Sequence, residues 1–154
     1  MAGIRHTDWD VSRRHAEIIS ENWPADVKTR KPQLLKKIPG VTGKRFTETV
    51  KSGIWLKPLG SQPGRTFSSV RDVVRKTLVV FVSGSSTRQS ATETDYELIR
   101  DRIRDLFQDR RVTDLDGELY SRTSMGDYDM DDVVSRKYDI DIIEISTIFR
   151  EDRA

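Results

Sequence analysis

Residues 77–82 carry the strongest structural signal in the chain. The run Thr77-Leu78-Val79-Val80-Phe81-Val82 is continuous, apolar and rich in β-branched side chains. Such side chains favour strands, and a strand without an alternating polar face is buried on both sides. The residues before it, back to Val70, also have strand character. The sequence therefore predicts a long strand over 70–82 that other elements must cover on both faces.

Two helices are predicted around this strand. Residues 7–22 begin with a weak capping box of Thr7 and Asp10, end before Pro24, and place an apolar stripe on one face: Val11, His15, Ile18 and Ile19. Residues 94–108 begin with a capping box of Thr94 and Glu97 and carry a second stripe: Tyr96, Ile99, Ile103, Leu106 and Phe107. His15 is predicted to be a packing residue.

Two further strands follow the second helix. A turn over 114–117 leads into a strand over 119–125, and residues 137–150 form the last strand. The apolar side chains of that strand change face at Ile142 and Ile143, which predicts either a bulge or burial on both faces. The fold class is α+β: a mainly antiparallel sheet flanked by an N-terminal and a central helix, in one domain over 1–154.

Residues 26–64 are the least globular stretch. Four prolines and five glycines interrupt it and lysines and arginines make it basic, yet it holds Phe46, Ile54, Trp55 and Leu56. We interpret it as a basic arm or hairpin insertion with a turn at Ser52-Gly53. Its apolar residues are expected to need a neighbouring chain for burial.

Charge is divided unevenly along the chain. Residues 1–91 hold 17 Lys and Arg against 7 Asp and Glu, and residues 92–154 hold 10 against 18, so a net charge of +2 hides a basic and an acidic half. Two such halves on different surfaces would attract copies head to tail, and such contacts can close into rings. A polyanion bound by the basic half is the alternative.

Composition excludes several classes of protein. Without cysteine the chain has no disulfide framework, no thiolate zinc site and no cysteine nucleophile. Its longest apolar run, 78–82, is too short to cross a membrane, and residues 1–10 contain no apolar signal-peptide core. We expect a protein made in the cytoplasm, with no membrane partner.

Catalytic and metal-binding patterns are weak. The two histidines, His6 and His15, sit in a terminus predicted to fray and on an apolar helix face, so no Ser-His-Asp arrangement is indicated. The Ser83–Ser86 loop lacks the glycines and lysine of a phosphate loop. Asp127, Asp129 and Asp131 lack the glycine and glutamate of an EF-hand, so a solvated acidic loop is favoured over a calcium site.

The last strand offers a further acidic cluster. Asp139 and Asp141 share one face, while Glu144 points to the other, so a nuclease-type metal centre is disfavoured against outward carboxylates. We predict no catalytic residue, no metal and no cofactor.

The basic stretch and its aromatic residues allow two interpretations. Phe46, Trp55 and Phe67 beside many cations are typical of nucleic-acid binding, but no recognised nucleic-acid motif accompanies them. The alternative, which we favour, is an arm that packs on another subunit with its tryptophan as an anchor.

The segment 76–150 resembles the core of tailed-bacteriophage tail terminator proteins, a head–tail joining family also called tail completion proteins. The matching features are the strand 77–82 leading into a polar loop, the striped helix, a short strand, an Asp-rich stretch, and a last strand ending in Ile148-Phe149-Arg150. The helix at 7–22 matches the opening helix of that family. The long basic insertion at 26–64 departs from the family pattern.

The resemblance implies a structural virion protein without catalytic activity. Such a subunit forms a homohexameric ring at the head–tail junction, caps the tail tube protein, binds the neck or head-completion protein, and leaves a channel through which DNA passes without sequence-specific binding. An acidic lining would repel phosphates, so the channel-lining candidates are Asp127, Asp129, Asp131 and Asp132. The subunit-interface candidates are Lys51, Trp55, Lys57, Arg100 and Arg104. A neck adaptor or stopper, or a DNA-binding accessory protein that uses the basic half, are the alternatives.

Overall fold

The computed structural model describes residues 5–27, 29–36, 41–42, 45–46, 53–84, 90–125 and 138–152. In these ranges the chain has an α+β fold whose helices and strands are, in order, α1 (Asp8–Glu21), β1 (Gln33–Leu34), β2 (Val41–Thr42), β3 (Arg45–Phe46), β4 (Gly53–Thr66), β5 (Val70–Gly84), α2 (Ser90–Phe107), β6 (Glu118–Met125) and β7 (Tyr138–Asp152). The predicted fold class is confirmed.

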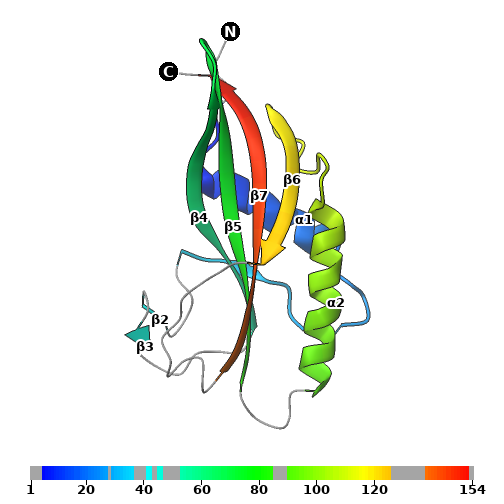
Figure 1. The fold of residues 1–154 in the computed structure, drawn as a ribbon. Helices are drawn as coiled ribbons and strands as arrows, with labels where there is room; N and C mark the ends of the chain where they lie inside the picture. Colours follow the sequence, from blue (N-terminus) through cyan, green and yellow to red (C-terminus); the bar gives the residue numbers. More distant parts are fainter. Residues whose placement is uncertain are drawn as a thin grey trace.

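One five-stranded sheet organises the described chain, in the order β1-β4-β5-β7-β6. Only β1 runs parallel to its neighbour, and the other pairs are antiparallel. Strands β5 and β7 pair along their whole lengths, from Val70 opposite Asp152 to Gly84 opposite Tyr138. This pair forms the centre of the sheet (Figure 1).

Both helices pack on the same face of the sheet. Residues that are opposite each other on neighbouring strands share a face, so Leu56, Val79 and Ile143 form one row across β4, β5 and β7. That row lies in a single core with residues from both helices, among them Ile18, Ile19, Tyr96, Ile99, Ile103 and Phe107. Each such side chain stabilises the fold by about 1.5–3 kcal/mol on burial. In Figure 1, α1 crosses behind the strands and α2 stands beside β6 and β7.

The two-sided burial predicted for residues 77–82 is confirmed, since all six are at most 2% exposed. The register of β5 with β7 has no shift, so the change of face at Ile142 and Ile143 needs no bulge. Both side chains are buried, on opposite faces of β7. The second of the two alternatives is therefore the correct one.

The predicted start of the second helix is wrong by one turn. Helix α2 begins at Ser90, so Thr94 lies inside it and does not cap it. Ala91, Thr92 and Glu93 contain no helix breaker, and the helix continues back through them. The first helix agrees with the sequence: Thr7 is the N-cap, and its side chain accepts a hydrogen bond from the backbone of Asp10.

The interpretation of residues 26–64 as an arm whose apolar residues need a neighbouring chain for burial is wrong for residues 53–56. Residues 53–64 belong to β4, and Ile54 and Leu56 are buried in the core of their own chain. Two of the four prolines and three of the five glycines that suggested a non-globular segment lie in β4. On its outer side this strand is paired, among the described residues, only at Trp55 and Leu56. Prolines are tolerated in edge strands because no ladder hydrogen bond is lost there.

Beyond Pro58, β4 continues beside β5, which stays paired with β7, and the two strands end in an exposed turn at the top of Figure 1. We call residues 57–71 the hairpin arm. Its residues 61–69 are all exposed, and its turn is closed by a hydrogen bond from the backbone of Phe67 to Val70. The arm therefore contributes little to the core on which its own two strands depend.

Candidate functional site

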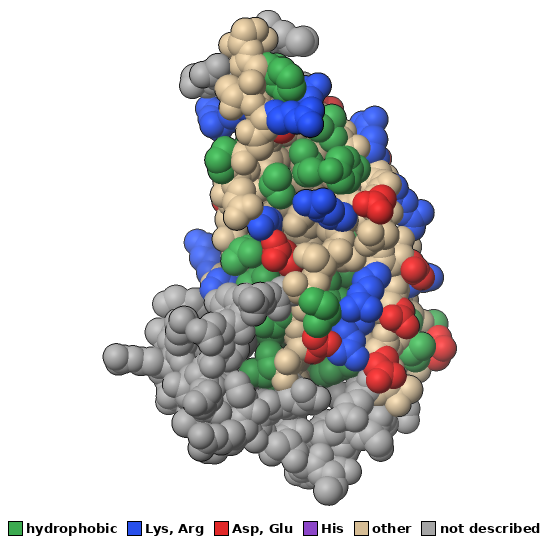
Figure 2. Space-filling model, viewed as in Figure 1, with side chains coloured by type: hydrophobic (Ala, Val, Ile, Leu, Met, Phe, Trp, Pro, Cys, Tyr) green, Lys and Arg blue, Asp and Glu red, His purple; other side chains and the backbone are tan. Residues whose placement is uncertain are grey.

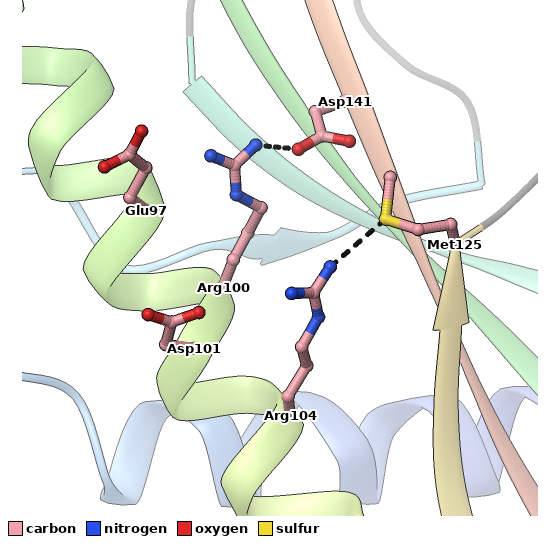
Figure 3. A pocket seen from close by; sticks show the side chains of 6 residues that line it. All are labelled: Glu97, Arg100, Asp101, Arg104, Met125 and Asp141. Carbon is pink, nitrogen blue, oxygen red and sulfur yellow. Dashed lines mark hydrogen bonds and ion pairs between the residues drawn. The ribbon is translucent and has the colours of Figure 1, made fainter.

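A hollow of about 300 Å³ lies between α2 and the ends of β6 and β7. Six side chains line this groove, which we call the α2 groove: Glu97, Arg100, Asp101, Arg104, Met125 and Asp141. Two of the predicted interface residues, Arg100 and Arg104, are among them. Figure 3 shows both guanidinium groups reaching from the helix toward the strands.

Arg100 is held within its own chain. Its guanidinium forms an ion pair with Asp141 of β7, and both side chains are 24% exposed. The guanidinium carbon also lies 5.8 Å from the centre of the Phe81 ring. Phe81 and Asp141 are opposite each other on β5 and β7, so the sheet fixes both partners of the arginine on one face. Arg100 therefore joins α2 to the sheet.

The other charged side chains of the groove lack strong partners among the described residues. Arg104 donates to the sulfur of Met125 at 3.3 Å, and a thioether is a poor acceptor. Among the described residues, Glu97 and Asp101 have no ion-pair partner, and both are exposed. They are four positions apart, so their carboxylates lie one helical turn from each other. The groove thus offers two unpaired carboxylates and a guanidinium with spare donors.

The other predicted interface residues lie elsewhere. Trp55 and Lys57 sit on β4, opposite Val80 and Leu78, on the sheet face away from the helices. Both side chains are half-buried, and the indole N–H of Trp55 has no hydrogen-bond partner among the described residues. Lys51 lies outside the described residues. The five candidates are therefore not brought together into one surface.

The acidic candidates are separated too. Asp127, Asp129, Asp131 and Asp132 lie outside the described residues, as does the side chain of Asp139. Asp141 lies on the helix-covered face, whereas Glu144 lies on the other and pairs with Lys76 at 2.9 Å. Within the described ranges no three His, Asp or Glu side chains approach one another closely enough to hold a metal ion.

His15 is at the centre of a buried network that the sequence did not reveal. Its Nδ1 lies 2.8 Å from Oγ1 of Thr77, and its Nε2 lies 2.7 Å from Oγ1 of Thr147. Ser12 bonds to Thr77 and Ser121 bonds to Thr147, at 2.6 and 2.7 Å. All five residues are fully buried, and burial lowers the pKa of His15 to about 3. The ring is neutral and packed, as predicted.

His6 is better ordered than a fraying terminus would be. Its Nε2 lies 2.7 Å from the backbone oxygen of Asp116, and its backbone N–H donates to Glu151. Glu151 is fully buried and accepts two hydrogen bonds from Arg75, which also pairs with Asp8. Burial lowers the pKa of Arg75, but its hydrogen bonds to Glu151 and Asp8 outweigh burial and raise it. These ion pairs fix the chain ends to the sheet.

The sheet face away from α1 is partly open. A row of Val74, Ile148 and Tyr120 crosses three strands there, and Tyr120 is 37% exposed. Arg150 pairs with Asp72 nearby and lies 4.6 Å above the Phe67 ring. Figure 2 shows apolar and charged side chains alternating over the upper part of this face. Lys76 and Arg150 on this face are paired with carboxylates, whereas Lys57 forms no ion pair with another described residue.

Comparison with known proteins does not assign the chain to a family. No protein-family model matches the chain, and no curated protein matches its sequence. In the described part of the chain, no helix has the length and apolar character needed to cross a membrane.

Proposed function

We propose that this chain is a structural virion protein of a tailed phage, a tail terminator whose copies form a homohexameric ring at the head–tail junction. The observation that carries the proposal is the hairpin arm, whose residues 61–69 are all exposed at the end of the two strands that hold them. Fixed, exposed extensions of this kind are suited to contacts with another protein.

The arrangement of the domain supports the same proposal. The elements on which the resemblance rests are β5, α2, β6 and β7, and they follow one another in the expected order. The turn of the hairpin arm and the α2 groove lie toward opposite ends of the sheet, since the turn precedes Val70 of β5 and the groove is level with Phe81. Such a subunit can join to identical copies without any additional protein.

The proposal is tested by native mass spectrometry and negative-stain microscopy at low and high salt. We expect hexamers, visible as rings with a central channel, that bind one end of purified tail tubes. Because the contacts join opposite charges, the hexamer population should fall as salt rises. A chain that stays monomeric and caps no tube would contradict the proposal.

A DNA-binding accessory protein is the second candidate, and the hairpin arm favours it as well because it carries cations and no carboxylates. This candidate predicts DNA affinity that falls steeply with salt. Monomers with such affinity would favour it over the ring. A neck adaptor or stopper would instead form rings that bind the neck and leave tail tubes uncapped.

A further inference from the structure

The hairpin arm carries charge of one sign only. Its residues 57–71 include Lys57, Arg65 and Arg71 and no aspartate or glutamate. Neither Lys57 nor Arg65 forms an ion pair with any other described residue. Two large apolar side chains accompany them, Leu59 at 41% and Phe67 at 40% exposed. The arm is therefore a cationic, partly apolar surface.

Helix α2 presents the complementary surface. Five carboxylates and three arginines lie within Ser90–Phe107, and Glu97 and Asp101 face the groove without a partner among the described residues. Two exposed apolar side chains flank these carboxylates: Leu98 is 49% exposed and Met125 is 56% exposed. Like charges one turn apart destabilise a helix unless cations approach them. With Arg100 paired to Asp141, the two remaining carboxylates of the groove exceed its remaining cation, Arg104, by one negative charge.

We infer that the hairpin arm of one copy of this chain docks in the α2 groove of a second copy. Arg65, at the exposed tip of the first copy's arm, approaches Glu97 and Asp101 of the second. Arg104, which among the described residues of its own chain donates only to the Met125 thioether, donates to backbone carbonyls on the open edge of β4. This inference rests on the proposed function, because it names the contact that builds the ring.

The tip of the arm cannot reach the α2 groove of the same subunit. The groove is level with Phe81 on β5, whereas Arg65 at the tip of the arm lies beside Thr66, which is opposite Arg71, ten residues away along β5. At about 3.3 Å per residue, Arg65 is roughly 30 Å from the groove of its own subunit. Each copy therefore offers one arm and one groove, and the contact is heterologous. Such contacts produce closed rings or open filaments.

Cross-linking tests the contact directly, because the chain has no cysteine of its own. Thr66 is exposed in the arm, and Leu98 is exposed beside the groove. Replacement of either residue by cysteine (Thr66→Cys or Leu98→Cys) leaves the net charge unchanged. We expect a short bismaleimide to join a mixture of the two variants into dimers. A mixture of Ala25→Cys, exposed beyond α1, with Leu98→Cys is the matched control. Equal yields in both mixtures, or none in the first, would overturn the inference.

Charge exchange separates this inference from the proposed function. Reversal of the arm (Arg65→Glu) and of the groove (Glu97→Lys with Asp101→Lys) should each weaken self-association about 100-fold, and the two variants mixed together should associate again. If both variants assemble like the parent chain, the docking contact is wrong and the ring proposal stands. If the parent chain itself remains monomeric, both are wrong.

Discussion

Nε2 of His15 lies 2.7 Å from Oγ1 of Thr147, while its Nδ1 lies 2.8 Å from Oγ1 of Thr77, so the ring joins α1 to the two central strands. A neutral imidazole has one donor and one acceptor nitrogen, which two hydroxyl groups can satisfy. A protonated ring would have two donors and a charge in a site without a counter-ion among these partners. The geometry therefore favours the neutral ring.

This site predicts an acid-sensitive fold. The pKa of His15 is about 3 in the folded chain and about 6.5 when unfolded, so the unfolded state binds more protons between these values. The free energy of unfolding should therefore fall with decreasing pH below 6.5, by up to about 1.4 kcal/mol per unit from this residue. Urea unfolding at pH 7 and 4.5 should show an extra loss of about 2–3 kcal/mol in the parent chain compared with His15→Gln. Parallel pH profiles would contradict this.

The ion pair of Arg75 and Glu151 predicts a strong dependence on both partners. Glu151 is fully buried, and no described cation other than Arg75 forms an ion pair with it. Arg75 donates two hydrogen bonds to its carboxylate, of 3.1 and 3.0 Å. Arg75→Met should destabilise the fold by about 3–5 kcal/mol, because a buried carboxylate loses its counter-ion. The double variant Arg75→Met with Glu151→Leu should regain most of that loss, as measured by chemical unfolding. A double variant as unstable as the single one would exclude this explanation.

Residues of one strand should differ sharply in their contribution to stability. Leu56 is fully buried in the core, whereas Leu59, three residues later on β4, is 41% exposed in the hairpin arm. We expect Leu56→Ala to lower the free energy of unfolding by about 2–5 kcal/mol. The matched change Leu59→Ala should alter it by no more than about 0.5 kcal/mol. Similar losses from both changes would mean that the arm contributes to the core.

Periodicity predicted the central fold well because the core residues repeat regularly. The stripe of α2 and the alternation of β7 are local patterns, and their burial follows from helix and strand geometry. Strand β4 escaped prediction because its burial depends on pairing with β5, and its prolines and glycines suggested an irregular segment. Whether such a segment forms a strand depends on pairing with residues distant in the sequence, which local β-propensity does not reveal.

The candidate site was predicted only in part. Arg100 and Arg104 were identified from the polar side of a helix, but their partners Asp141 and Met125 lie on strands that the topology alone brings to them. The hydroxyl partners of His15 were likewise unpredictable, since Thr77 and Thr147 are 62 and 132 residues away. The sequence signals that pointed toward the arm and the groove were the uneven distribution of charge, the basic stretch 26–64 and the polar side of the second helix.

The prolines of β4 should protect an open sheet edge. Pro58 and Pro63 lie where β4 has no outer partner among the described residues, and the register of β4 with β5 shifts after each of them. Proline and irregular pairing prevent an edge from recruiting strands of other molecules. Pro58→Thr with Pro63→Thr should therefore speed aggregation severalfold, followed by light scattering and thioflavin fluorescence, and each single change should have a smaller effect. An unchanged aggregation rate in the double variant would show that the edge is blocked by other means.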